Sequence, residues 1–416
     1  MFILSLSLAT PLLLVLLVQV KWTGQFLRLY RSPAILQSGS TNPHVGIIMS
    51  LRGADPFLEC SLRGLMSLDY PSHEIRIVVD SEIDPAFKIV DRVHRELAAS
   101  HVVLEILDVC QHTASLKNSA LVQGINGCSS RCEVYAWVDA DTVPDPGWLR
   151  ALVAPLQEDS VGAACGIRWY APPTTTVANY VRHIWNSAAV IQMVAHGIGW
   201  GGAFAIRKTV YEELKLEEKW ERALFEDTLA SNEVLLRGRR MAFVPACTMP
   251  NAESATMKWC TNFVTRQLQG LRYYHGAWRQ VLGFGLFSGV VLLGNIAMVP
   301  WALMNRDFVS AGIGLSVILT FGVTIGWLMQ YVEREVDSLL GDRSIGNGSR
   351  PLMLALAAPI TQVIHLIALV RAYMQRNVNW RGIDYEVRSG MDIVRRNYSP
   401  YAHEKQLQET VREHSL

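Results

Sequence analysis

Four uncharged, strongly apolar runs constrain the fold of this chain more than any other feature. They cover residues 1–20, 281–304, 308–332 and 351–370. A helix needs about 20 consecutive apolar residues to cross the hydrocarbon core of a bilayer. The runs therefore predict an integral, multi-pass membrane protein with helices in the lipid bilayer at both ends of the chain.

Residues 1–21 are predicted to form an N-terminal transmembrane anchor. No basic stretch precedes this run and no small-residue cleavage site clearly ends it, which favours an uncleaved anchor over a removed signal peptide. Lys21, Arg28 and Arg31 follow, and basic residues beside a transmembrane helix mark its cytoplasmic side. The segment after the anchor is therefore expected to face the cytoplasm, in a bacterial inner membrane or a Golgi-type membrane.

The C-terminal runs form one predicted membrane region, residues 281–372. The first two are separated only by residues 305–307, which predicts a hairpin that crosses the membrane and returns. Pro359 and several polar residues interrupt the third run, so it either spans the bilayer or lies in its interface. This choice decides where the tail, residues 373–416, lies: outside if the run spans, in the cytoplasm if it does not.

The intervening stretch, residues 45–277, is long enough to bury a core of its own. Short apolar runs alternate in it with segments of helical spacing. This alternation predicts an α/β domain with a mostly parallel mixed sheet and helices on both faces, in which ligands bind beyond the carboxyl ends of the strands. The expected strands are 44–50, 74–79, 102–107, 134–138 and 203–207, and the expected helices are 57–68, 84–98, 116–125 and 228–236.

Charge and cysteine content exclude other classes of protein. The chain has 38 Lys and Arg against 37 Asp and Glu, so no nucleic acid is expected as a partner. Its seven cysteines are scattered and odd in number, which does not suggest a disulfide framework. Cys128 and Cys132 have no matching second pair, so no zinc site is expected there.

The motif Asp139-Ala140-Asp141 directly follows an expected buried strand. Two carboxylates two residues apart point the same way if the backbone stays extended. They would repel each other unless a cation lies between them, and Mg²⁺ or Mn²⁺ suits such oxygen ligands. The alternative is an Asx turn that closes the strand, shaped by Pro144 and Pro146.

Three further polar residues could line a ligand site at the same predicted edge of the sheet. Asp80 ends the second strand, where it either accepts hydrogen bonds from a nucleotide base or caps a turn. Arg52 follows the first strand and could line the same pocket. Lys117 opens a helix, where it either meets a diphosphate or is an ordinary solvated lysine.

The pair Glu226-Asp227 precedes an expected helix. It supplies either a general base that deprotonates an incoming hydroxyl or ordinary helix capping. Upstream, Trp200-Gly201-Gly202 lies in a glycine-rich loop that either lets the backbone approach an acceptor closely or is a plain turn.

Gln269, Arg272 and Tyr273 precede the membrane region. Gln269 and Arg272 share one face of a helix, Arg272 could clamp a diphosphate, and Tyr273 could stack on a ligand. The alternative is the basic-aromatic belt found beside transmembrane helices.

Taken in order, these motifs resemble the inverting, family-2-like membrane glycosyltransferases of GT-A fold, such as ceramide glucosyltransferases, hyaluronan synthases and cellulose synthases. Four segments are most similar to ceramide glucosyltransferases and related bacterial glycolipid enzymes. They are Leu51-Arg52-Gly53-Ala54-Asp55-Pro56, Leu68-Asp69-Tyr70-Pro71, Asp84-Pro85-Ala86 and Val378-Asn379-Trp380-Arg381-Gly382.

The resemblance implies a role for each motif. Asp80, with Asp84 as a rival, would hold the uridine of a UDP-sugar, and Arg52 and Lys117 would bind the same donor. Asp139 and Asp141 would bind the complex of UDP with Mg²⁺ or Mn²⁺. Asp227, with Glu226 beside it, would be the catalytic base. The closing residues over UDP would be Gln269, Arg272 and Tyr273, with Tyr in place of the usual Trp, and Trp200, Gly201 and Gly202 would lie on the acceptor side.

The implied function is transfer of a hexose from a UDP-sugar to the hydroxyl of a membrane lipid such as ceramide, with inversion. Glucose is the expected hexose. The alternative is a processive polysaccharide synthase of the hyaluronan or cellulose synthase type. A membrane scaffold that keeps an inactive transferase fold is a third interpretation.

Overall fold

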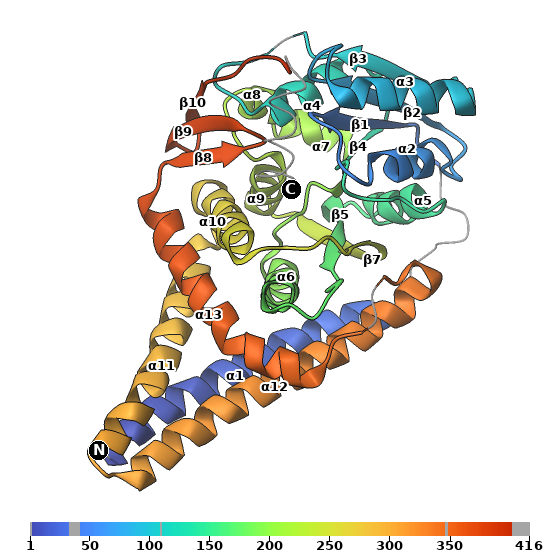
Figure 1. The fold of residues 1–416 in the computed structure, drawn as a ribbon. Helices are drawn as coiled ribbons and strands as arrows, with labels where there is room; N and C mark the ends of the chain where they lie inside the picture. The colour runs from blue at the N-terminus through green and yellow to red at the C-terminus, as the bar shows by residue number, and fades with distance from the viewer. Residues whose placement is uncertain (1, 33–41, 109, 346–347, 402–416) are drawn as a thin grey trace.

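The computed structural model describes residues 2–32, 42–108, 110–345 and 348–401. Figure 1 shows an α/β domain above a group of long helices. In the described part of the chain, the domain is built on a seven-stranded sheet with the order β3-β2-β1-β4-β6-β5-β7. The strands are β1 (Val45–Leu51), β2 (His73–Val79), β3 (Val102–Ile106), β4 (Val134–Val138), β5 (Val161–Tyr170), β6 (Ala203–Arg207) and β7 (Arg240–Asn251).

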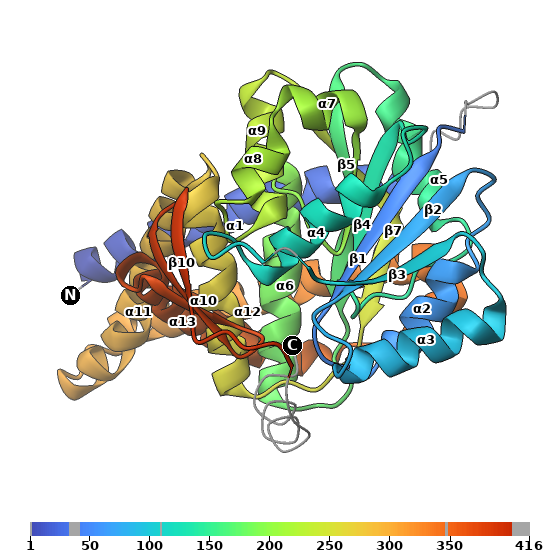
Figure 2. The ribbon, with the colours of Figure 1, turned by 90° about the horizontal axis from the view of Figure 1, so that it is seen from above.

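Strand direction matches the predicted mixed sheet. β1 pairs in parallel with both β2 and β4, β2 pairs in parallel with β3, and β5 pairs in parallel with β7. β6 runs antiparallel to its neighbours β4 and β5. The predicted α/β fold class is therefore confirmed, and Figure 2 shows the twist of the sheet from above.

Helices cover both faces of the sheet. On one face, Ile47 and Met49 of β1 pack in a core with α2 (Leu58–Met66), α3 (Pro85–Leu97) and α5 (Trp148–Val153). On the other face, Ile48 packs in a second core with α4 (Leu116–Gly127), α7 (Lys208–Glu213), α8 (Leu216–Trp220) and α9 (Glu226–Leu236). Alternate residues of β1 thus face opposite cores, as the pleat of a strand requires.

Two other helices lie between the sheet and the apolar helices: α6 (Val177–His196) and α10 (Met257–Tyr274). Both have a threonine at the N-cap. Thr176 accepts a hydrogen bond from the Asn179 backbone N–H, and Thr256 accepts one from the Trp259 backbone N–H. Such caps satisfy donors that a helix start would otherwise leave unpaired. The two helices therefore give the apolar helices a defined platform on the α/β domain.

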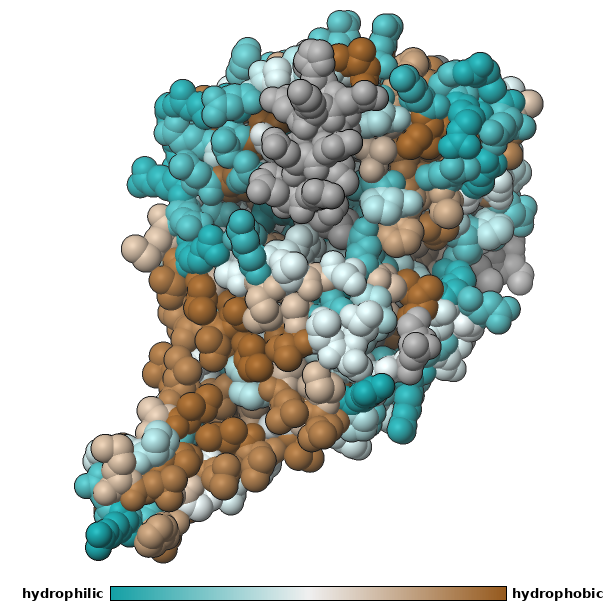
Figure 3. Space-filling model, viewed as in Figure 1, coloured by the Kyte–Doolittle hydropathy of each residue, from teal (hydrophilic) through white to brown (hydrophobic). Residues whose placement is uncertain are grey.

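Within the described residues, four helices are long and apolar enough to cross a membrane: α1 (Phe2–Arg31), α11 (Trp278–Met304), α12 (Phe308–Leu340) and α13 (Pro351–Met374). Figures 1 and 3 show α1, α11 and α12 together in an apolar projection below the domain. Asn295 of α11 donates a hydrogen bond to the Leu8 carbonyl of α1, at 3.0 Å, which ties two of them together.

Helix α13 differs from the expectation that Pro359 interrupts it. The helix is continuous through that proline. Both of its ends contact the α/β platform. The Arg350 N–H donates to the Tyr180 hydroxyl of α6 at 2.9 Å, and Arg272 of α10 donates to the Ala372 carbonyl at 2.7 Å. The start and the end of α13 therefore lie on the same side of the apolar projection.

After α13, the chain forms a small sheet that the sequence did not predict. In the described residues it has three antiparallel strands: β8 (Asn377–Trp380), β9 (Ile383–Ser389) and β10 (Asp392–Arg396). Its apolar residues Val378, Tyr385 and Ile393 are buried in the same core as α4 and α9. The predicted tail, residues 373–416, extends beyond Tyr401 into residues that lie outside the described part of the chain.

Candidate functional site

A polar cavity of about 1290 Å³, part of it open to solvent, lies at the carboxyl ends of β1, β2 and β4. The sequence places charged residues there because each strand is followed directly by one: Arg52 after β1, Asp80 after β2 and Asp139 after β4. Parallel strands bring these positions to one edge of the sheet. Of the residues predicted from sequence, Arg52, Asp80, Lys117, Asp139, Asp141, Trp200, Glu226 and Asp227 line this cavity.

Lys117 joins two of the predicted motifs. Its Nζ lies 2.5 Å from Asp139 Oδ1 and 2.6 Å from Glu226 Oε1. Although burial alone would lower it, the carboxylates of Asp139, Glu226 and Asp227 hold the pKa of Lys117 above its usual value. Burial raises the pKa of Glu226 to about 7, against the opposing effect of Lys117. This lysine therefore bridges the end of β4 and the start of α9.

Asp141 has the properties of a metal ligand whose site is not filled by another group of the protein. Its carboxylate accepts no hydrogen bond from the described residues, whereas Asp139 is held by Lys117. Burial and the nearby charge of Asp139 raise the pKa of Asp141 to about 6. A hard divalent cation with oxygen ligands would relieve this repulsion, so the Asp139–Asp141 pair fits Mg²⁺ or Mn²⁺.

Asp227 lies in the first turn of α9 and is fixed by backbone donors. The Gly201 N–H donates to its Oδ2 at 2.8 Å, and the Thr228 N–H donates to its Oδ1 at 2.6 Å. A Cβ on Gly201 would clash with Glu226 and lie 3.2 Å from Asp227 Oδ2. The glycine-rich loop is thus needed for close approach to the carboxylates. Gly201 and Gly202 are not among the residues that line the cavity.

Asp80 is already engaged by the C-terminal segment. Its Oδ1 accepts from the Tyr398 hydroxyl at 2.7 Å, and its Oδ2 accepts from the Tyr401 N–H at 3.1 Å and from Arg52. The rings of Tyr398 and Tyr401 lie 5.5 and 5.3 Å from the Arg52 guanidinium carbon. The rival position, Asp84, lies outside the cavity lining and caps α3, where it accepts from the Ala86 N–H.

Two arginines in the cavity carry positive charge that no carboxylate of the described residues neutralises through an ion pair. Neither Arg168 of β5 nor Arg266 of α10 forms an ion pair with a carboxylate in the described part of the chain. Burial and the neighbouring cations Arg168 and Arg381 lower the pKa of Arg266 to about 10. Arg381, by contrast, pairs with both oxygens of Asp55, at 2.8 and 2.7 Å. The unpaired arginines therefore provide a place for an anion.

The polar cavity is not lined by Gln269, Arg272 or Tyr273. Gln269 donates to the Asn377 carbonyl at 3.3 Å, and the Tyr273 hydroxyl donates to the Gln375 carbonyl at 3.3 Å. Arg272 donates to carbonyls at the end of α13. Here the three residues hold the small C-terminal sheet and α13 on the domain, and their expected role at a ligand stays a prediction.

A second, mostly apolar cavity of about 1570 Å³, partly open to solvent, extends between α6 and the apolar helices. Residues of α1, α11, α12 and α13 line it, including Thr23, Phe284, Ile325 and His365. Its polar groups are mostly neutral: Gln362 of α13 donates to Ser288 at 2.8 Å, and Trp185 donates to His365 at 3.2 Å.

The polar and apolar cavities meet. Among the described residues, five line both: Arg168, Trp200, Asp227, Thr228 and Gln267. Arg168 and Asp227 are the residues of the apolar cavity's described lining that carry a full charge. The shared wall therefore places one carboxylate and one guanidinium where the two spaces join.

Sequence reasoning missed several residues of the polar cavity, namely Arg168, Arg266, Gln267, Trp380, Arg381 and Tyr385. Arg266 precedes Gln269 by three residues, so helical spacing could have indicated it. The sequence has Trp380 and Arg381 in a segment that resembles the family, but no local pattern marks them as site residues. They reach the cavity because the chain returns to the domain after α13 and the Trp380 ring stacks 5.8 Å from Phe225.

Comparison with known proteins identifies the family to which this chain belongs. Residues 8–393 match the family model described as Glycosyl transferase family 21. A curated relative, Glucomannan 4-beta-mannosyltransferase 1 of Oryza sativa subsp. japonica, is 30% identical over 113 residues. That match covers 27% of this chain and only 22% of the relative, about a fifth of its length.

Comparison with solved structures supports the fold. Mannosyltransferase PcManGT from Pyrobaculum calidifontis, solved with GDP-Man and Mn²⁺, has a TM-score of 0.51 at 16% identity and covers 88% of this chain and 99% of its own. This likeness, together with the sheet, confirms the GT-A-like fold. Glucosyl-3-phosphoglycerate synthase from Mycobacterium tuberculosis, solved with Mn²⁺, UDP and phosphoglyceric acid, has a TM-score of 0.36 at 11% identity. It covers 55% of this chain and 78% of its own.

Proposed function

The chain belongs to glycosyl transferase family 21 and is a nucleotide-sugar glycosyltransferase. We propose that it transfers a hexose from a UDP-sugar to the hydroxyl of a membrane lipid, with inversion. Glucose is the first donor sugar to test, and ceramide the first acceptor. The observation that carries the proposal is the shared wall, where Asp227 borders both a polar cavity and an apolar cavity.

The polar cavity suits the donor. Asp139 and Asp141 would hold Mg²⁺ or Mn²⁺, which would neutralise charge on the diphosphate. Arg168 and Arg266 offer two guanidinium groups without carboxylate partners, and guanidinium groups bind phosphate oxygens well. Lys117 keeps Asp139 and Glu226 at a fixed spacing. The uracil base would lie toward Asp80 and Arg52, where the Tyr398 hydroxyl contacts Asp80.

Asp227 is the general base in this proposal. The hydrogen bonds from Gly201 and Thr228 orient its carboxylate and leave lone pairs free for an acceptor hydroxyl. Asp227 takes the hydroxyl proton as the acceptor oxygen bonds to the anomeric carbon. The bond from that carbon to the diphosphate breaks on the opposite face, and UDP leaves with its electron pair. An α-linked donor therefore gives a β-linked product.

The apolar cavity suits a lipid acceptor. Helices that are apolar enough to span a membrane line it, and its lining becomes charged only at the shared wall among the described residues. A lipid that enters from the bilayer could thus keep its chains in an apolar environment while its hydroxyl reaches Asp227. A soluble sugar acceptor would have no need of such a lining.

The membrane arrangement follows from the helix ends. In this proposal α1, α11 and α12 cross the bilayer, and the α/β domain faces the cytoplasm, on the side of Arg28 and Arg31. Both ends of α13 contact the domain, which favours an interfacial helix over a fourth crossing. The C-terminal sheet then stays on the cytoplasmic side, where it can border the donor cavity. A bacterial inner membrane and a Golgi-type membrane both satisfy this arrangement.

A donor and acceptor screen tests the proposal. Full-length protein in detergent, with Mg²⁺ or Mn²⁺, is given separate UDP-sugars together with ceramide or a mixed lipid extract. UDP release is recorded and the lipids are analysed by mass spectrometry. The expected product is a lipid that has gained one hexose, and NMR of that product determines whether its anomeric bond is β.

Each other outcome contradicts part of the proposal. UDP release with a growing polymer and no modified lipid would assign the chain to the processive polysaccharide synthases. Transfer to a soluble sugar, with the lipid ignored, would remove the role given to the apolar cavity. No UDP release from any donor in the presence of lipid would favour an inactive scaffold.

A further inference from the structure

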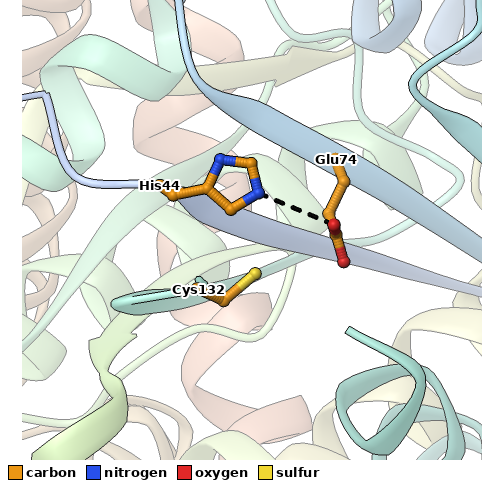
Figure 4. Close-up of side chains that lie close together, drawn as sticks. All are labelled: His44, Glu74 and Cys132. Carbon is orange, nitrogen blue, oxygen red and sulfur yellow. Dashed lines mark ion pairs between the residues drawn. The ribbon is translucent and has the colours of Figure 1, made fainter. Parts of the chain in front are cut away.

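A cluster of metal-ligating side chains lies at the opposite edge of the sheet from the polar cavity. His44 precedes β1, Glu74 is in β2 and Cys132 precedes β4. One ligand atom from each lies within 4.8 Å of the other two. Figure 4 shows the His44 ring and the Glu74 carboxylate turned toward each other, with the Cys132 sulfur beside them. The three parallel strands therefore bring nitrogen, oxygen and sulfur ligands together at their amino ends.

A fourth candidate ligand is Cys128, at the C-cap of α4. A Cβ placed on Gly46 would lie 2.6 Å from the Cys128 sulfur and 3.2 Å from the Cys132 sulfur. Both sulfurs thus lie over the same glycine of β1, and only a glycine leaves room for them. The Cys128 thiol also interacts with Cys132 and with Glu74. Two sulfurs, one carboxylate and one imidazole are a ligand set that Zn²⁺ accepts.

His44 and Glu74 turn toward the cluster the atoms that their other contacts leave free. His44 uses Nδ1 for a hydrogen bond with Ser72 Oγ at 2.8 Å, and its buried Nε2 has no hydrogen-bond partner in the described structure. Glu74 accepts from the Ser129 N–H through Oε1 at 2.7 Å, which leaves Oε2 toward His44. Metal ligands in proteins are commonly oriented in this way by outer hydrogen bonds.

The spacing of His44 and Glu74 and the charge of the cluster also agree with a bound metal ion. His44 Nε2 and Glu74 Oε2 lie 3.6 Å apart, and ligands of a tetrahedral zinc ion lie roughly 3.3–3.8 Å apart. With both thiols ionised, the two sulfurs and Glu74 would carry three negative charges, so Zn²⁺ would leave one. Arg76, whose Nε is 3.7 Å from Glu74 Oε1, is placed to balance that charge.

We propose that His44, Glu74, Cys128 and Cys132 bind one structural Zn²⁺ ion, which ties together the amino ends of β1, β2 and β4 and the end of α4. The site is separate from the donor cavity, because the two lie at opposite edges of the same strands. It was not expected from the sequence because Cys128 and Cys132 lack a second cysteine pair. The fold supplies that second pair from His44 and Glu74, 84 and 54 residues before Cys128.

Metal analysis of the full-length protein tests this site. The chain is purified in detergent without a polyhistidine tag, with a phosphine reductant and excess Mg²⁺, which keeps the donor cavity from collecting zinc. Elemental analysis is expected to find about one zinc per chain. Cys132→Ser and Glu74→Gln should lose at least nine-tenths of it, whereas Cys60→Ser, which changes an exposed cysteine, should keep it.

Cobalt substitution keeps the test independent of folding defects in the variants. Wild-type protein stripped of zinc and given Co²⁺ should show a thiolate-to-cobalt charge-transfer band, which zinc then displaces. A wild-type chain with no zinc and no such band would overturn the proposal, as would full zinc content in both site variants. In protein prepared without reductant, loss of two titratable thiols without bound metal would replace it with a Cys128–Cys132 disulfide. None of these measurements depends on sugar transfer, so the site and the proposed function fail separately.

Discussion

Two walls of the polar cavity differ in how they are built. The strand-end wall consists of residues that directly follow strands of the main sheet, such as Asp80 and Asp139. The C-terminal wall consists of residues such as Trp380, Arg381 and Tyr385, which return to the domain after more than 90 residues of apolar helices and their connections. The first wall is fixed by strand pairing, and the second belongs to the small C-terminal sheet, which packs on the domain through buried side chains such as Val378 and Tyr385.

This difference suggests a division of roles. The strand-end wall and Asp227 hold reacting and charge-bearing groups on the ends of paired strands and on the first turn of a helix. The C-terminal wall is attached through the ion pair between Arg381 and Asp55, the stacking of Trp380 on Phe225 and the hydrogen bond from Tyr398 to Asp80. We expect changes in the first wall to reduce kcat, and changes in the second to alter the KM of the donor.

Asp227→Asn should have the largest effect. The amide keeps the shape of the side chain but cannot take a proton, so kcat should fall about 10²- to 10⁴-fold. Donor binding, measured as UDP-sugar affinity by calorimetry, should stay within about twofold, because Asp227 does not carry the diphosphate. Transfer at nearly the wild-type rate would exclude Asp227 as the base, and Asp159→Asn, at a fully exposed carboxylate, is the matched control.

Asp141→Asn should come next. It removes the carboxylate that has no hydrogen-bond partner among the described residues, and with it one of the two proposed metal ligands. We expect a loss of about 10²- to 10³-fold in kcat/KM, comparable with removal of one strong electrostatic contact. Higher Mn²⁺ should recover part of the activity, and isothermal titration with Mn²⁺ and UDP measures the weaker binding. Unchanged metal dependence would remove Asp141 from the metal site.

Arg266→Ala and Arg272→Ala separate a binding role from a structural one on the same helix. Loss of a charged hydrogen bond costs about 1.5–3 kcal/mol, so Arg266→Ala should raise the donor KM about 10- to 100-fold. Its stability should not fall, because Arg266 has no ion pair to lose and lies near other cations.

Arg272→Ala should show the opposite pattern. This arginine holds carbonyls at the end of α13, so its loss should lower the thermal midpoint in detergent while the donor KM changes little. Initial-rate kinetics and thermal melts on both variants check the pair. If Arg272→Ala raises the KM and Arg266→Ala only destabilises, the role that resemblance gives to Arg272 is correct.

The same contrast explains what the sequence could predict. Asp139 follows a strand whose five residues are all buried, so a local pattern was enough to place it at the carboxyl edge. The sequence also predicted that Gln269 and Arg272 lie on one helix, but it did not predict which side of that helix faces the cavity. Arg381 could not be placed, because its position depends on α13 ending beside the domain and on a small sheet burying Val378. Such contacts are tertiary, and no local periodicity reports them.

Tyr398→Phe should have the smallest effect, and its sign is informative. The Tyr398 hydroxyl occupies Asp80 Oδ1, while Tyr401 and Arg52 occupy Oδ2. If Asp80 receives a hydrogen bond from the uracil ring, that donor competes with the tyrosine. Removing a hydrogen bond worth about 1 kcal/mol should then lower the KM of the UDP-sugar about fivefold and leave kcat unchanged.

The matched control for that variant is Tyr273→Phe, which removes a tyrosine hydroxyl that contacts a backbone carbonyl and not Asp80, and which should not change the KM. A KM that rises in Tyr398→Phe would mean that the hydroxyl supports Asp80 when the donor is bound. The C-terminal wall would then belong to the binding site itself. A KM that falls would mean that the contact between Tyr398 and Asp80 must open before the donor can bind.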